Sequence, residues 1–333
     1  MKIEIIAEIA QGFEGKFEQA KLLIQAAASS GASAVKFQMV YADELATPDY
    51  KYFDLFKSLE MSDKAWKELS DFASKSKIEM QLDIFGTKSL NLAENLDVNT
   101  IKLHGTDIVN LNLLNEVSLS SVKRILLGAG GAYLDEIEKP LEILSKKQVV
   151  VLCGFQGYPT PTNTNHLKRI SLLDRHFSSK FSNVSIGFAD HALPESNLSI
   201  PIVSMAIGAG AKVIEKHLTL GRSMKLEDYE SALNPDEFLI FTKTIFESST
   251  AFGNSSLSND FDMSNLEIDY RGQIRRHVVS TKALRPGDEI TVDDVTLKRT
   301  SSKNPITDLR DVYKKRLVSE VSANKPIFLN EVE

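Results

Sequence analysis

The sequence predicts an α/β protein: a (β/α)8 TIM barrel followed by a small C-terminal β-rich domain. Short apolar, β-rich runs alternate with longer amphipathic stretches eight times, the number and size of such a barrel, roughly 250 residues. From about residue 274 the composition changes to short strands and turns with no long helix. A doubly wound open sheet is the alternative, but it usually has fewer units, and no GxGxxG follows the first run.

Each predicted unit consists of one apolar run and the helix that follows it. The runs cover residues 3–9, 34–38, 79–85, 100–105, 124–131, 149–154, 184–191 and 212–220. The helices are expected near 16–30, 62–76, 87–96, 111–119, 133–145, 165–177, 195–208 and 235–251. Gly31 should end the first helix and Ser62 should cap the second. An irregular insertion is expected between residues 38 and 62.

Composition divides the chain into three regions. We expect a barrel domain over residues 1–252, a Ser- and Asn-rich linker over 253–273 and a compact β domain over 274–333. Within the last region, ALRPGDEITVDDV (283–295) is echoed by SANKPIFLNEV (322–332). This echo suggests an internal pseudo-repeat.

The composition and net charge of the chain limit its possible partners and its cellular compartment. The chain has 333 residues, of which 42% are hydrophobic, and a formal net charge of −6, which argues against a nucleic-acid partner. Its one cysteine, Cys153, excludes an intramolecular disulfide and suits a reducing compartment. No apolar run approaches the roughly 18 residues that span a membrane, and the N-terminus lacks the cationic region of a signal peptide. We expect a cytoplasmic protein.

Polar residues recur where the predicted strands end, which is where TIM-barrel active sites lie. They are Glu8, Gln11, Lys36, Gln38, Gln81, Asp83, Lys102, His104, Asp107, the glycine-rich run 128–131, Cys153, Gln156, Tyr158, Asp190, His191, Glu215 and His217. A single strand Lys or His is more often a packing residue, but the clustering predicts a polar, anion-compatible active site. Because strand residues alternate in facing, His217 and Glu215 should face the barrel interior and Lys216 the helices.

His191 and His217 lie at matching ends of neighbouring strands, which are about 4.8 Å apart. Two imidazole nitrogens with open positions beside them suit Mn²⁺, Mg²⁺ or Fe²⁺ better than structural zinc. Two unconnected core histidines are the alternative. Lys36 and Lys102 would add positive charge, and the glycine run at 128–131 would offer backbone N–H groups to a phosphate.

Seven segments resemble motifs of the sialic acid synthase family, N-acetylneuraminate synthase and its nonulosonic relatives. In chain order they are AEIAQGFEG, AVKFQ, TIKLHGTD, CGFQGYPTP, IGFADHA, IEKHLTL and EDYESALNP. The tail resembles the antifreeze-like (SAF) domain of that family, and LKRT places Arg299 at an arginine that reaches a partner's active site. The resemblance covers essentially the whole chain and implies a domain-swapped homodimer.

The resemblance implies a condensation of phosphoenolpyruvate with an open-chain N-acetylhexosamine-type aldose such as N-acetylmannosamine. The products would be a sialic or nonulosonic acid-type 2-keto acid and phosphate. In that scheme His191 and His217 bind Mn²⁺ or Mg²⁺. We predict a catalytic set of Glu8, Lys36, Lys102 and Asp190, and a substrate-binding set of Gln38, Asp83, Thr106, Gly128, Gln156, Tyr158, Asp228 and Arg299.

The chain departs from the family pattern in the phosphate half of the site. Serines that contact phosphoenolpyruvate in the family are here Gly105, Gly128 and Ala189, and Gln156 replaces an asparagine. Gly12 and Phe13 stand where the family usually has Asn-His, and Thr106 would restore one hydroxyl donor. Two other functions therefore stay open: a metal-dependent aldolase or lyase acting on a related keto acid, and a non-catalytic sugar-binding descendant.

Overall fold

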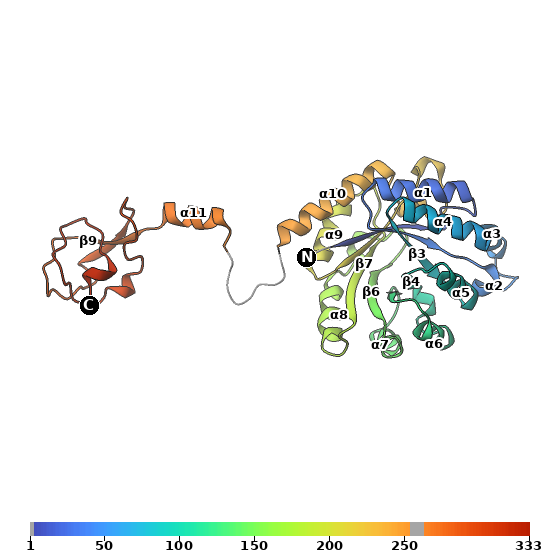
Figure 1. The fold of residues 1–333 in the computed structure, drawn as a ribbon, viewed down its shortest axis with the longest axis horizontal. Helices are drawn as coiled ribbons and strands as arrows, with labels where there is room; N and C mark the ends of the chain where they lie inside the picture. The colour runs from blue at the N-terminus through green and yellow to red at the C-terminus, as the bar shows by residue number, and fades with distance from the viewer. Residues whose placement is uncertain (1–2, 254–262) are drawn as a thin grey trace. The chain divides into compact units, whose positions relative to one another are not determined.

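Eight parallel strands close into a barrel in chain order, which confirms the predicted TIM-barrel fold. The structure is a computed structural model and describes residues 3–253 and 263–333. The strands are β1 (Glu4–Ala10), β2 (Ala34–Gln38), β3 (Glu79–Ile84), β4 (Thr100–Leu103), β5 (Arg124–Gly128), β6 (Gln148–Gly154), β7 (Val184–Asp190) and β8 (Val213–His217). Figure 1 shows the helices lying outside the ring of strands.

One helix follows each strand along the outside of the barrel, close to its predicted bounds. These are α1 (Phe17–Ser29), α4 (Asp63–Lys75), α5 (Thr87–Asn95), α6 (Leu111–Leu119), α7 (Leu134–Ile143), α8 (Lys168–Ser178), α9 (Ser199–Gly208) and α10 (Pro235–Phe252). The insertion after β2 is not wholly irregular, since it holds the short helices α2 (Ala42–Leu45) and α3 (Phe53–Leu59).

Two predicted helix signals are confirmed by the backbone. The Ser62 hydroxyl accepts the Ala65 N–H at 3.2 Å and so caps α4. Gly31 follows α1 with φ of 77°, a left-handed conformation that glycine adopts without a steric penalty. Both signals act within a few residues of chain, which is why the sequence alone reveals them.

Strand alternation separates two kinds of side chain. The outward-facing residues pack with the helices in one large apolar core. The inward-facing residues include a small apolar cluster: Ile6, Ala34, Leu126, Val150, Leu152 and Val213. The register places Ile6 beside Glu215 and Glu8 beside His217. At the opposite ends of the strands, the first residue of β5, Arg124, pairs with the first residue of β1, Glu4. The apolar cluster therefore lies between this charged pair and the charged groups near the C-terminal ends of the strands.

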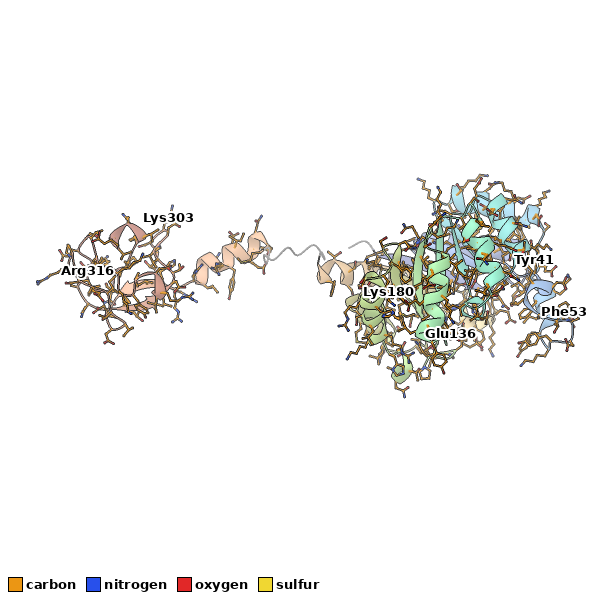
Figure 2. All side chains as sticks on the ribbon, turned by 90° about the horizontal axis from the view of Figure 1, so that it is seen from below. Tyr41, Phe53, Glu136, Lys180, Lys303 and Arg316 are labelled. Atoms are coloured by element: carbon orange, nitrogen blue, oxygen red, sulfur yellow. The ribbon has the colours of Figure 1, made fainter. Side chains whose placement is uncertain are left out.

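The chain divides into two compact units, Met1–Ser255 and Ser256–Glu333. The second unit holds α11 (Asn265–Ile274) and an antiparallel pair, β9 (His277–Ser280) and β10 (Val295–Lys298). Its own apolar core includes Val278, Ile290 and Leu317. Figure 2 labels Lys303 and Arg316, both exposed, in this unit.

Helix α11 occupies part of the segment 253–273, whose composition predicted a linker. The Ser264 hydroxyl accepts the Glu267 N–H at 3.3 Å, and the Glu267 carboxylate accepts the Ser264 N–H at 2.6 Å. These reciprocal bonds form a capping box, which starts a helix. Residues 254–262 of the predicted linker lie outside the described residues.

The second unit contains an internal backbone repeat where the sequence showed its faint echo. Leu284 and Val321 exchange both backbone N–H···O bonds, at 2.9 and 3.0 Å. Each is followed by a tight turn containing a residue of positive φ, Gly287 at 87° and Asn324 at 60°. The Gly287 N–H donates to Leu317, and equivalently the Asn324 N–H donates to Ser280. Two copies of one turn motif therefore pair with each other.

In the part of the chain that the structure describes, no helix is both long and apolar enough to cross a membrane.

Candidate active site

A cavity of about 320 Å³ opens at the C-terminal ends of the barrel strands. Nine of the predicted site residues line it: Glu8, Gln38, Lys102, Thr106, Gly128, Tyr158, His191, His217 and Asp228. They lie on β1, β2, β4, β5 and β8 and in the loops after β4, β6, β7 and β8, so residues from across the sequence meet at one rim. Lys36 and Asp83 are fully buried and are not part of the cavity lining.

An ion network lies at the base of the cavity. Lys102 Nζ lies 2.7 Å from one oxygen of Glu215, and Lys36 Nζ lies 3.4 Å from the other. Lys36 also contacts Glu8, and Lys102 lies 3.8 Å from Asp83. Buried charges are tolerated only when they are paired in this way. Glu215 therefore belongs in the centre of β8 because it is the shared partner of two lysines.

The network distributes positive charge unequally between the two lysines. Burial, with the nearby Lys102 charge, lowers the pKa of Lys36 to about 8, although Glu215 opposes the shift. Burial also acts on Lys102, but Glu215 and Asp83 outweigh it and raise the Lys102 pKa. The pKa of Glu215 is lowered by the two lysines despite its burial. Lys102, which faces the cavity, is thus the firmly charged ammonium group.

His191 and His217 converge, with ring centroids 5.2 Å apart. Tyr158 packs edge-on against both rings, at 5.7 and 5.5 Å. Burial, with Lys102, lowers the pKa of His191 to about 4, and burial with His191 lowers the pKa of His217 well below its usual range. Both imidazoles are therefore neutral near pH 7 and keep a lone pair for a ligand bond.

The geometry of His191 fits a metal ligand. Its Nδ1 lies 3.1 Å from the Ala189 carbonyl oxygen, so Nδ1 carries the proton and Nε2 has the free lone pair. Among the described residues, no group of three or more His, Cys, Asp and Glu side chains converges as a metal site. The donor set is thus two neutral imidazoles, which suits an open, substrate-accessible divalent ion and not a closed structural zinc site.

Asp190 does not lie in the cavity, which corrects its predicted catalytic role. It pairs in register with Lys216, and both side chains face the helices. Lys216 Nζ lies 2.8 Å from Asp190 and 3.0 Å from the Ala192 carbonyl oxygen, while Asp190 accepts the Ala192 N–H at 3.2 Å. The pair fixes the backbone on either side of His191, so Asp190 is a positioning residue. Lys216 faces the helices, as the alternation predicts.

Gln156 is also displaced from its predicted place. Phe155 has φ of 62° and turns the chain after β6, so that Phe155 lines the cavity and packs against His191 at 5.2 Å. Gln156 instead lines a separate cavity of about 690 Å³ beside α7 and α8, together with Cys153 and Arg169. Burial raises the pKa of the Cys153 thiol to about 12, so this cysteine is unreactive.

Asp228 occupies the loop after β8 in a left-handed conformation, with φ of 62°. Its carboxylate accepts the Gln11 N–H at 3.2 Å, and the Tyr158 hydroxyl donates to its carbonyl oxygen. Burial, assisted by Glu227 and Glu230, raises the pKa of Asp228 to about 6. The predicted substrate residue in the second unit, Arg299, is exposed, and its side chain donates to the Ile274 carbonyl oxygen at 3.3 Å. Its role stays a prediction.

The site also includes residues that the predicted set omitted. They are His104, Gly105, Gly130, Leu152, Gly154, Phe155, Ala189 and Glu215. Alternation in β8 signals Glu215, since it shares a face with His217. Alternation in β4 likewise signals His104, which follows Lys102 by two residues. Phe155 carries no such signal, because its position depends on a backbone turn.

The fold and cavity define a TIM-barrel enzyme whose active site combines a charged ammonium group with a pair of neutral imidazoles. A model of the NeuB family matches residues 23–256, and the chain belongs to this family. The family assignment confirms the resemblance to sialic acid synthases.

Individual relatives match along most of the chain. The N,N'-diacetyllegionaminic acid synthase of Campylobacter jejuni is 29% identical over 321 residues, covering 90% of this chain and 91% of that protein. The structure of the N-acetylneuraminic acid synthetase of Leptospira borgpetersenii matches with a TM-score of 0.72 and 26% identity over 82% of this chain and 93% of that one. A spore coat polysaccharide biosynthesis protein of Bacillus subtilis shares the fold, with a TM-score of 0.65 and 24% identity over 100% and 95%.

Proposed function

We propose that this sialic acid synthase-like enzyme condenses phosphoenolpyruvate with an open-chain N-acetylhexosamine-type aldose in a metal-dependent reaction. The products are a sialic or nonulosonic acid-type 2-keto acid and phosphate. One observation carries the proposal: the Lys102 ammonium and the neutral imidazoles of His191 and His217 face the same cavity. Such a site accepts an anionic donor and a carbonyl acceptor side by side.

The residues divide the work between the two substrates. Lys102 binds the negative charge of the donor, and the carboxylates of Glu8 and Asp228 orient the hydroxyls of the sugar. His191 and His217 would hold Mn²⁺ or Mg²⁺, which when bound polarises the sugar aldehyde as a Lewis acid. Carbon 3 of the donor forms the new bond to the aldehyde carbon, whose oxygen takes a proton. Water then adds at carbon 2 and gives up a proton, which balances the proton taken by the aldehyde oxygen. The bond from carbon 2 to the phosphate oxygen breaks, so that carbon 2 becomes the ketone and phosphate leaves.

The second unit has a proposed role by the same resemblance. We take it to be an antifreeze-like (SAF) module, which its paired turn motifs support, and the working enzyme to be a homodimer. Light scattering of the full chain tests the assembly, since a monomer at working concentration would contradict it.

Phosphate release tests the reaction. The chain is incubated with phosphoenolpyruvate, a panel of open-chain aldoses and Mn²⁺ or Mg²⁺, with each component omitted in turn. We expect release only when all three are present and the sugar is an N-acetylhexosamine. Cleavage or aldol activity with pyruvate alone would instead indicate an aldolase or lyase, which the lack of hydroxyls at Gly105, Gly128 and Ala189 favours. Ligand binding without turnover would indicate a non-catalytic sugar-binding protein.

A further inference from the structure

Three residues that line the active-site cavity lack a side-chain hydroxyl at positions where the resemblance implies serines. Gly105, Gly128 and Ala189 all line the cavity. Gly105 and Gly128 are in close contact, because a Cβ at Gly128 would lie 2.8 Å from the Gly105 nitrogen. The backbones of the two loops thus approach closely in place of side-chain donors. An anion bound here needs hydrogen-bond donors from other groups.

His104 directly precedes Gly105, follows Lys102 by two residues and lines the same cavity. Its Nδ1 accepts the Thr106 backbone N–H at 3.4 Å and lies 3.0 Å from the Thr106 hydroxyl. A nitrogen that accepts from a backbone N–H carries a lone pair there, so the ring proton is on Nε2. Phe85 flanks the ring at 6.2 Å. Within the described ranges, Nε2 has no hydrogen-bond partner.

We propose that His104 binds the phosphate group of the donor substrate through its Nε2–H, beside the Lys102 ammonium. This assignment rests on the proposed function and adds a specificity residue to it. The imidazole supplies a hydrogen-bond donor, which the side chains of Gly105, Gly128 and Ala189 lack. Thr106 positions the ring by fixing its tautomer, and its hydroxyl extends the same polar surface.

The electrostatics of the ligand-free site indicate that His104 is a neutral hydrogen-bond donor. Burial lowers the pKa of His104, and the charges of Lys102 and Lys36 lower it further, against the opposing charges of Asp83 and Asp107. A phosphate group arriving next to the ring adds negative charge and reverses this effect. Phosphate binding should therefore raise the pKa of His104, and an imidazolium ring forms a stronger, charge-assisted hydrogen bond.

Steady-state kinetics of His104→Ala and His104→Gln test the assignment, with His176→Ala as the matched control. His176 is half-buried beside Glu138, outside the active-site cavity. We expect His104→Ala to raise the KM for phosphoenolpyruvate and the inhibition constant of inorganic phosphate by about 10- to 100-fold. The KM for the aldose and the metal content should not change. His104→Gln keeps a side-chain N–H near the Nε2 position and should recover part of the loss.

Two results would overturn the role of His104. One is an unchanged inhibition constant for phosphate in the folded His104→Ala protein. The other is an increase in KM for the aldose with no change in KM for phosphoenolpyruvate. NMR titration of the histidine ring protons with inorganic phosphate gives a test that needs no turnover. The His104 signal, assigned by its absence in His104→Gln, should titrate at higher pH with phosphate present, and no shift would contradict the proposal. If the unmodified chain shows that shift but no synthase activity, the proposed function fails while the phosphate site stands.

Discussion

Lys102 and Glu215 form an ion pair across the interior of the barrel, with Nζ 2.7 Å from Oε1. They lie on β4 and β8, which are on opposite sides of the ring of eight strands. The pair therefore ties together two strands that share no backbone hydrogen bonds. It also holds the Lys102 ammonium at the height where the cavity begins.

Removing Glu215 should destabilise the barrel strongly. In Glu215→Ala the two lysines lose their shared partner, and breaking a buried ion pair from one side costs about 3–5 kcal/mol. Urea unfolding measures this as a lower midpoint. Glu18→Gln is the control, because the exposed Lys21–Glu18 pair on α1 should contribute less than about 0.5 kcal/mol. Equal effects of the two substitutions would show that the network adds nothing beyond a surface pair.

Removing either imidazole should abolish activity without unfolding the protein. His191→Ala or His217→Ala deletes one of two proposed metal ligands, so bound Mn²⁺ and turnover should both fall by more than about 100-fold. Elemental analysis after dialysis gives the metal content independently of activity, and His176→Ala should leave both readouts unchanged. A folded variant with normal metal content and turnover would eliminate the metal site.

Stability should depend on pH through Asp228. Its pKa is about 6 in the folded protein because of burial and nearby acids, against about 3.9 when unfolded. Between these pKa values the unfolded chain binds fewer protons than the folded protein. The free energy of unfolding therefore falls as pH rises from about 4 to 6 and is constant above about pH 6.

The Asp228→Asn variant isolates this effect. Asparagine tolerates the left-handed backbone and can still accept the Gln11 N–H. The variant should be about 1–3 kcal/mol more stable than the parent chain at pH 8 and equal to it near pH 4. Its kcat/KM should fall, because the carboxylate that orients the sugar is gone. A stability difference that is constant from pH 4 to 8 would contradict the raised pKa.

A serine should be tolerated at Gly105 but should destabilise the protein at Gly128. A Cβ at Gly128 would lie 2.8 Å from the Gly105 nitrogen, whereas a Cβ at Gly105 would lie 3.1 Å from the Gly130 oxygen. Gly128→Ser should therefore lose about 1–3 kcal/mol by overpacking, while Gly105→Ser needs only a slight shift. Thermal unfolding measures the difference, and Gly105→Ser should also lower the inhibition constant of phosphate. The reverse order of stability would contradict the close contact between the two loops.

The barrel could be predicted because its signals are local and repeated. Each strand is an apolar run with a helix behind it, and caps such as Ser62 act within one turn. The convergence of His191 and His217 was also predictable, since consecutive strands of a closed barrel end side by side. The capping box of Ser264 and Glu267 was equally visible in the sequence, and reading it would have predicted α11 inside the supposed linker.

The predicted roles of Asp190 and Gln156 differ from the structure because side-chain direction decides whether a residue reaches the cavity. Asp190 precedes His191 by one residue, so the alternation that turns His191 inward turns Asp190 toward the helices and Lys216. That rule was available from the sequence. The exchange of Gln156 for Phe155 was not, because it depends on a left-handed backbone at Phe155 that a bulky residue rarely adopts. The ion network of Glu215 required distances across the barrel, which no pattern along the chain supplies.

The paired turns of the second unit have a consequence for synthesis. Leu284 bonds to Val321, and Leu317 forms a bridge with Val332 near the end of the chain. The segment that contains Leu284 cannot complete its backbone hydrogen bonds or its apolar core until the segment from Leu317 to Val332 has left the ribosome. The module should consequently fold only after translation has passed Val332, and a premature stop a dozen residues earlier should leave both halves open to proteolysis.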